Sequence, residues 1–124
     1  QSPGGELLPT FYVCDFIQKL DTPVHTYVDG FAASAATLIS VSGRHRTMTR
    51  HSSMLIHQLR SDASGKFQEL REELNNLDSF MQNVKDIYLR NTLLDENTLN
   101  NLLISDIWLD SENCLKYGLV DKIE

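Results

Sequence analysis

Residues 28–36, which read VDGFAASAA, join an extended segment to an apolar helical pattern through one glycine and a run of small side chains. The segment that precedes them, residues 24–29 (VHTYVD), alternates and is rich in β-branched and aromatic side chains, which predicts a strand. After Gly30 the small residues lead into a helical pattern that stops near Gly43. A strand that turns directly into a helix is typical of α/β folds, and here it places Ser34 at the bend.

A long amphipathic helix is the clearest periodic feature of the chain and is predicted over Lys66–Arg90. Its apolar positions are separated by alternating steps of three and four residues, and they are Phe67, Leu70, Leu74, Leu77, Met81, Val84 and Tyr88. About 25 residues make a helix of roughly 37 Å. A helix with one apolar face of that length must cover it with its own domain or with another subunit, and the sequence leaves both open.

Shorter elements on either side complete an alternating order. The predicted helices are residues 7–20, 95–103 and 111–117, and the predicted strands are residues 46–49, 53–59 and 119–123. Pro9 in a first turn, Asp95 as an N-cap and Gly118 as a terminating glycine mark the ends of these helices. The order α, β, α, β, β, α, α, α, β predicts an α/β layer structure with crossover helices, and 124 residues allow one domain.

The composition is that of a globular protein, with 41% hydrophobic and 23% charged residues. The formal charge of -6 argues against a nucleic-acid binder, which needs a basic face to neutralise phosphates. No apolar run is long enough to span a bilayer, and no secretory signal pattern opens the chain. Cys14 and Cys114 form no CxxC pair, so we expect reduced, partly buried thiols in a reducing compartment, with a disulfide as the alternative.

Ser34 is the first candidate for chemistry, because a serine on a tight strand-to-helix bend exposes its hydroxyl. The N–H of the next residue, Ala35, faces the same space, and unpaired amides at a helix N-terminus can stabilise an oxyanion. The residues alone leave a second interpretation open, in which Ser34 only caps the helix. The G-x-S-x-G pattern of the α/β-hydrolases is absent.

A serine nucleophile needs a base and an orienting carboxylate. His57 lies late in an apolar segment, whereas His45 and His51 lie in polar surroundings and His25 begins a strand. Asp106 follows a predicted helix and precedes another apolar segment. Taken alone, His57 also fits a hydrogen-bonded core residue, and Asp106 an exposed acid at a helix end. The histidine spacing fits no ligand pair, so no metal site is expected.

Four ordered segments carry a resemblance to a known family. They are Ser2-Pro3-Gly4-Gly5, Asp29-Gly30-Phe31-Ala32-Ala33-Ser34-Ala35-Ala36, Met54-Leu55-Ile56-His57-Gln58 and Tyr117-Gly118-Leu119-Val120-Asp121. In these segments and their spacing, essentially all 124 residues of the chain resemble the ClpP family of ATP-dependent proteases. The resemblance implies an α/β crotonase-like ββα superhelix with a protruding handle helix at residues 66–90. Residues 1–124 would form a single peptidase domain, the C-terminal two-thirds of the family's chain, with the N-terminal part absent.

The family's pattern implies a serine endopeptidase with Ser34 as nucleophile, His57 as general base and Asp106 as the acid that orients it. Gly5 and Ala35 would supply the backbone N–H groups of an oxyanion hole. Glycine is expected in that turn because a Cβ would obstruct the approach of a substrate carbonyl. Hydrolysis would proceed through an acyl-enzyme, with an extended polypeptide substrate paired to the chain that precedes the handle helix. No cofactor and no metal are implied.

The family also implies an assembly of two stacked seven-membered rings that enclose a chamber. An AAA+ unfoldase such as ClpX, ClpA or ClpC would feed in unfolded polypeptides, in a bacterial or phage-infected cytoplasm or in an organelle stroma or matrix. Ile104 and Ser105 stand where many members carry an acid–arginine pair that links the rings. Asp29, Thr47 and Thr49 stand where many members place apolar residues of the unfoldase-docking pocket. Ring contacts and docking contacts are therefore expected to differ from the family's usual ones.

Three other functions fit parts of the sequence. A non-catalytic ring subunit of a Clp-type complex would typically have lost a member of the triad, and all three residues are present. A crotonase-type enzyme acting on a coenzyme A thioester would share the fold and the glycine-rich turn, but it does not need this serine, histidine and aspartate. A membrane-associated signal-peptide peptidase would use a Ser–Lys dyad and a membrane anchor, and the sequence indicates neither.

Overall fold

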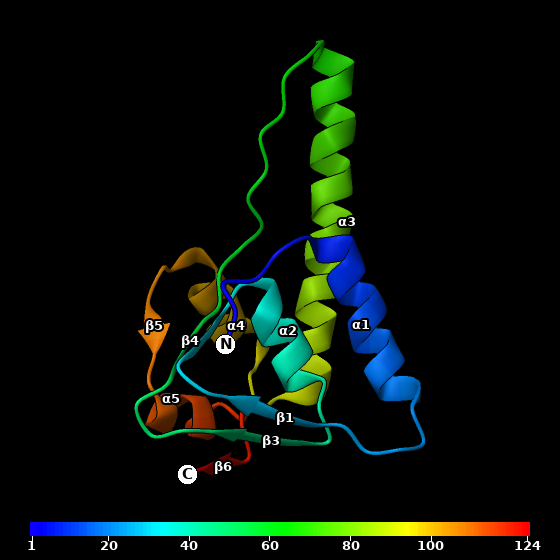
Figure 1. Ribbon diagram of the computed structural model, residues 1–124. Coiled ribbons are helices and arrows are strands. Elements are labelled where there is room, and N and C mark those ends of the chain that lie inside the picture. The colour runs from blue at the N-terminus through cyan, green and yellow to red at the C-terminus, as the bar shows by residue number, and fades with distance from the viewer.

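The computed structural model describes all 124 residues and confirms the α/β class (Figure 1). The helices are α1 (Leu7–Lys19), α2 (Ala35–Val41), α3 (Phe67–Asn91), α4 (Glu96–Ile104) and α5 (Ser111–Lys116). The strands are β1 (His25–Val28), β2 (Phe31–Ala33), β3 (His45–Met48), β4 (Ser53–Leu55), β5 (Trp108–Leu109) and β6 (Lys122–Ile123). None of the helices combines the length and the apolar composition that crossing a bilayer requires.

Two small sheets form the body of the molecule. In the first, β3 lies between β1 and β6 and both pairings are parallel. In the second, β4 pairs in parallel with β2 and antiparallel with β5. Ser2 forms an isolated bridge beside Ala32, so the N-terminal residues run along β2. This arrangement brings the start of the chain, the end of β2 and the end of β4 close together (Figure 1).

Two of the strands, β2 and β5, are missed by the sequence prediction, and two predicted strands are too long. β2 ends in two alanines, which have a low strand propensity, and it is extended because it pairs with β4. β5 has two residues, which is too short for a periodic pattern to detect. The strand predicted over 53–59 ends at Leu55, and the one predicted over 119–123 is confined to Lys122–Ile123.

Every helix contributes to one hydrophobic core, and α2 lies in its middle. Leu38 and Val41 of α2 are buried, with α1 and α3 packed against this helix. Val84 and Tyr88 are the buried residues of α3, and both lie in its C-terminal half. The turn that carries Ser34 is therefore attached to the best-packed helix of the molecule.

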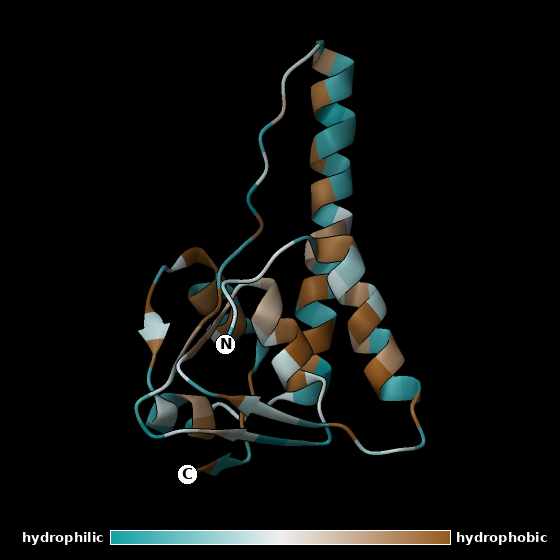
Figure 2. Ribbon diagram, in the orientation of Figure 1, coloured by the Kyte–Doolittle hydropathy of each residue, from teal (hydrophilic) through white to brown (hydrophobic).

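The long helix is confirmed to within one residue at each end. Its N-terminal half projects beyond the body, beside the extended chain of residues 56–66 (Figure 1). Apolar residues recur along this projecting half (Figure 2), where Phe67 is 77% exposed and Leu74 is 60% exposed. The stripe thus covers the core in the C-terminal half of the helix and has no cover within this chain in the other half, where the contact with another subunit stays a prediction.

Helix ends and cysteines follow the sequence predictions. Asp95 accepts a hydrogen bond from the Thr98 N–H at 2.7 Å, and Gly118 adopts a φ of +70° after α5. Cys14 and Cys114 are buried free thiols in this structure, and no disulfide joins them. Burial raises the pKa of both thiols, and that of Cys114 to about 12.

Candidate active site

Ser34 occupies the turn between β2 and α2 in a conformation that L-residues rarely adopt. Its φ of 58° and ψ of −129° make it the only non-glycine residue with a positive φ. The Ser34 N–H donates to the Leu55 carbonyl of β4 at 2.9 Å, which ties the turn to the neighbouring strand. The Ser34 hydroxyl makes no capping hydrogen bond, so the interpretation that it only caps the helix is wrong.

Two unpaired backbone N–H groups lie near this serine. Neither the Ala35 N–H nor the Gly5 N–H donates a hydrogen bond within the chain. The turn that carries Gly5 crosses closely over Ser34, because a Cβ added at Gly4 would lie 2.9 Å from the Ser34 Cβ. Gly4 also has a φ of +100°, whereas a Cβ at Gly5 would meet no atom within 4 Å. Contacts within the protein therefore require glycine at Gly4 but not at Gly5. The obstruction of a substrate carbonyl by a Cβ at Gly5 stays a prediction.

His57 is half-buried and follows directly after the end of β4. Its Nδ1 lies 2.6 Å from the carbonyl oxygen of Gln58. A carbonyl oxygen only accepts, so in the neutral imidazole that a general base requires, Nδ1 is the nitrogen that carries the proton and donates it. The other ring nitrogen, Nε2, then keeps its lone pair and can accept a proton. The Gln58 carbonyl thus sets the tautomer that a general base needs.

One cavity of about 320 Å³ brings these groups together. Its lining includes Ser34, His57, Gly5 and Ala35. No hydrogen bond joins the Ser34 hydroxyl to His57. Acyl transfer requires a nucleophile, a base that can accept a proton, and amide donors for the oxyanion. All of these groups lie around this one cavity.

Asp106 lies outside this cavity, and it is exposed without a hydrogen bond or an ion pair. The antiparallel register of β4 and β5 pairs Met54 with Leu109 and Leu55 with Trp108, so its continuation would place Asp106 opposite His57. The register does not continue, because the Gln58 N–H donates to Leu103 at 2.7 Å instead of meeting residue 105. Residues 104–107 therefore leave the sheet register, and no hydrogen bond joins the Asp106 carboxylate to His57.

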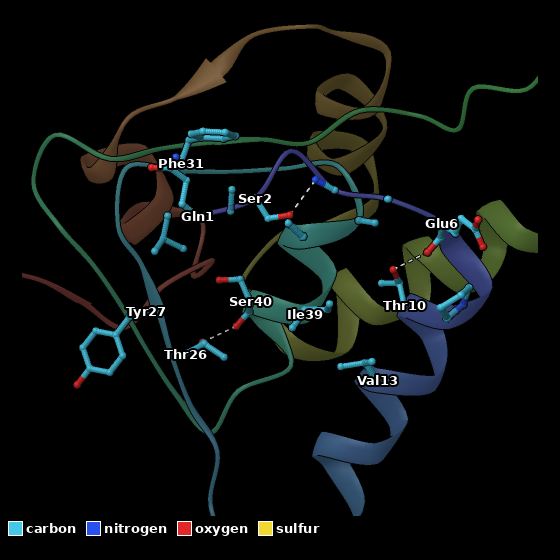
Figure 3. A pocket seen from close by; sticks show the side chains of 17 residues that line it. Gln1, Ser2, Glu6, Thr10, Val13, Thr26, Tyr27, Phe31, Ile39 and Ser40 are labelled. Carbon is cyan, nitrogen blue, oxygen red and sulfur yellow. Dashed lines mark hydrogen bonds between the residues drawn. The ribbon is translucent and has the colours of Figure 1, made fainter.

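A second cavity of about 460 Å³ lies on the other side of the N-terminal turn, between β1, α1 and α2 (Figure 3). Three of its hydroxyls are hydrogen-bonded, since Ser2 accepts from the Gly4 N–H, Thr10 donates to the Glu6 carbonyl and Thr26 donates to the Ser40 carbonyl. It contains no histidine or cysteine. Its only acidic side chain is Glu6, and none of its hydroxyls is hydrogen-bonded to that carboxylate, so this larger cavity holds no paired nucleophile and base.

The remaining histidines do not form a site of their own. His25 and His45 face each other across β1 and β3, with ring centroids 4.8 Å apart, and both are exposed. His51 is exposed as well, as its polar surroundings predicted. No group of three or more histidine, cysteine or acidic side chains is arranged to hold a metal ion.

Two residues near Ser34 were missed as functional candidates. Thr37 of α2 and Tyr88 of α3 are both buried, their hydroxyls are hydrogen-bonded to each other, and Tyr88 also borders the cavity of Ser34 and His57. The sequence prediction counted Tyr88 only as a member of the apolar stripe. The sequence signal that could have identified Tyr88 was its hydroxyl, because a buried tyrosine needs a hydrogen-bond partner.

Comparison with known proteins finds a matching family model and similar curated proteins. The family model described as Clp protease matches residues 1–124. One similar curated protein is the ATP-dependent Clp protease proteolytic subunit 1 of Protochlamydia amoebophila (strain UWE25), which is 29% identical over 126 residues. The match covers 98% of this chain and 61% of that protein, so the chain spans about three fifths of the length of this relative.

Proposed function

This chain belongs to the Clp protease family, as its four sequence motifs predicted, and from that premise we propose that it is the catalytic part of a serine endopeptidase subunit. Family membership also confirms the crotonase-like ββα fold with its handle helix. The observation that carries the proposal is the cavity where Ser34, His57 and the free N–H groups of Gly5 and Ala35 meet. The substrates are unfolded polypeptides.

Hydrolysis runs through an acyl-enzyme on Ser34. The Ser34 Oγ attacks the scissile carbonyl while Nε2 of His57 takes its proton, and the Gly5 and Ala35 N–H groups receive the negative oxygen. The C–N bond then breaks, and His57 returns the proton to the leaving amine. Water attacks the ester with His57 again as base, which releases the acid product and restores the Ser34 hydroxyl.

Asp106 takes its place in the triad when residues 104–107 straighten. The carboxylate then accepts a hydrogen bond from the Nδ1–H of His57 in place of the Gln58 carbonyl, and it stabilises the imidazolium that forms during attack. The β4–β5 register supports this step, since its continuation pairs His57 with Asp106. The conformation described above is then a resting one, with the base in the right tautomer but without its charged partner.

The assembly we propose is a homo-oligomer of two stacked heptameric rings. The exposed apolar residues on the projecting half of α3 support a contact with another subunit. Phe67, Leu70 and Leu74 lie on one stripe of the helix, and no residue of this chain covers them. An AAA+ unfoldase would deliver the substrate to the enclosed chamber. Tyr27, which is 63% exposed on the edge strand β1, is available for that docking.

The test uses the full-length subunit in its assembled form, with a fluorophosphonate probe and a short fluorogenic peptide. We expect labelling and turnover by the wild type, loss of both in Ser34→Ala, and no change in Ser79→Ala, a control at an exposed serine of α3. Equal turnover by the wild type and Ser34→Ala would remove Ser34 from the mechanism.

A non-catalytic ring subunit is the second candidate, and the position of Asp106 outside the cavity is the observation that favours it. An inert wild type that still forms rings would support this candidate. Turnover of a coenzyme A thioester would instead indicate a crotonase-type enzyme.

A further inference from the structure

The backbone of Ser34 is held from two sides in its unusual conformation. Its N–H is bound to the Leu55 carbonyl, and its own carbonyl accepts two hydrogen bonds from Thr37, one from the N–H at 2.9 Å and one from Oγ1 at 2.6 Å. A non-glycine residue at positive φ costs about 1–3 kcal/mol and persists only where its surroundings enforce it. Thr37 is fully buried, so no water competes for these two bonds.

Tyr88 extends this contact into a relay with a defined direction. The Thr37 hydroxyl donates its single proton to the Ser34 carbonyl, so its hydrogen bond with Tyr88 must be one that it accepts. The order is therefore Tyr88 O–H to Thr37 O–H to Ser34 C=O, from α3 through α2 to the turn. Burial raises the pKa of Tyr88 well above its usual value, so this phenol remains a donor at any pH at which the protein works.

The carbonyl at the end of the relay belongs to the same peptide unit as the Ala35 N–H. A trans peptide is planar, so fixing the direction of its C=O also fixes the opposite direction of its N–H. Hydrogen bonds accepted by the carbonyl also polarise the unit and strengthen the N–H as a donor. The Ala35 N–H has no partner within the chain and lines the cavity of Ser34 and His57.

We infer that Thr37 and Tyr88 are positioning residues that aim and polarise the Ala35 N–H of the oxyanion hole. This inference rests on the proposed peptidase function. It assigns to the packed end of α3 a role in setting the geometry of the nucleophile turn, through a contact between Thr37 and Tyr88, which are 51 residues apart in the sequence. Thr37 does not line the cavity, whereas Tyr88 borders it with only 2% of its surface exposed and acts on the turn through the hydroxyl that it directs at Thr37.

The test compares Thr37→Val and Tyr88→Phe in the assembled full-length subunit, because both changes keep the shape and remove one hydroxyl. We expect kcat for a fluorogenic peptide to fall about tenfold in Tyr88→Phe and about 30-fold in Thr37→Val, within the roughly 10²–10³-fold that an oxyanion donor is worth. KM should stay unchanged, since the oxyanion exists only after attack. A proportional loss of kcat and of folded protein, or a rise in KM alone, would overturn the inference.

Thr10→Val is the matched control, because Thr10 is also a buried threonine whose hydroxyl donates to a main-chain carbonyl, that of Glu6. Its kcat should equal that of the wild type. If Ser34→Ala abolishes turnover but Thr37→Val and Tyr88→Phe retain it fully, the inference fails while the proposed function stands. If the wild type is inert, the proposed function fails, and crystal structures decide the inference separately. A Ser34 φ that stays near +58° and an unmoved Ala35 N–H in Thr37→Val would then refute it.

Discussion

The two sides of the candidate active site differ in how firmly the chain holds them. On the nucleophile side, Ser34 is bound through both its N–H and its carbonyl and is attached to the buried helix α2. On the acid side, residues 104–107 leave the sheet and Asp106 has no partner. The difference teaches that contacts within the chain fix Ser34 and the backbone N–H groups proposed to bind the oxyanion. The charge that orients the base depends on a segment that these contacts do not fix.

The largest expected effect tests the weakly held side. Asp106→Asn should lower kcat by on the order of 10³–10⁴, because an amide cannot stabilise the His57 imidazolium. The free energy of unfolding should not change, since Asp106 is exposed and unbonded. Peptidase assays and chemical denaturation of the assembled subunit measure both. Asp78→Asn, at an exposed position of α3, is the control. Unchanged kcat in Asp106→Asn would mean that the Gln58 carbonyl alone orients the base, and the proposed triad would be wrong.

The next effect tests the firmly held side through its glycine turn. Gly4→Ala should lower the free energy of unfolding by about 2–3 kcal/mol, because it puts a side chain at positive φ against the Ser34 turn. The added Cβ would lie 2.8 Å from the Ala33 carbonyl oxygen, so activity should fall as Ser34 is displaced. Thermal and denaturant unfolding measure the stability loss.

Gly5→Ala is the matched variant, since a Cβ there meets no protein atom. It should unfold like the wild type, within about 0.5 kcal/mol. Equal destabilisation by the two substitutions would show that the turn is not held as tightly as the Gly4 contacts indicate.

The smallest expected effect is on stability, and it concerns the ion pair between Arg46 and Asp121 in the body of the molecule. The Arg46 side chain donates two hydrogen bonds to the Asp121 carboxylate, at 2.7 and 3.1 Å, and a third to the Asn91 carbonyl, which joins β3, the residue before β6 and the end of α3. The hydrogen bond from Arg46 lowers the pKa of Asp121. A lowered pKa adds stability that is present above the unfolded pKa of about 3.9 and is lost as the pH falls through the folded value.

Acid unfolding of Asp121→Asn measures this contribution. The variant should be less stable than the wild type at neutral pH by less than about 1 kcal/mol, because the carboxylate is 44% exposed and screened by solvent. The difference should shrink as the pH falls below about 4. Asp86→Asn breaks an exposed pair with Arg90 and is the control. A difference between Asp121→Asn and the wild type that grows at acid pH would contradict the assignment.

Some of this arrangement was accessible from the sequence because it is local or periodic. The steps of three and four residues located α3 to within one residue, and the small residues after Gly30 located the Ser34 turn. β2 and β5 were not accessible, because two or three residues become a strand only through their neighbour β4. The catalytic roles of Ser34, His57 and Asp106 stay predictions.

The pairing of Thr37 with Tyr88 and the break in register at residues 104–107 were not accessible either. The Thr37–Tyr88 pairing joins side chains on α2 and α3, and the sequence pattern of one helix does not show where the other helix lies. Residues 104–107 depart from a sheet register that the sequence does not reveal. Both depend on tertiary contacts, and both lie at the candidate site.

The reactivity of the two buried thiols can report local unfolding of the chain. Cys14 lies in α1 and Cys114 in α5, and each is at most 2% exposed with a raised pKa. A thiol reagent reacts with the thiolate, so neither cysteine should react until its helix detaches. The modification rates of Cys14 and Cys114, read by mass spectrometry, would therefore time the loosening of the two ends of the chain separately, without any added label.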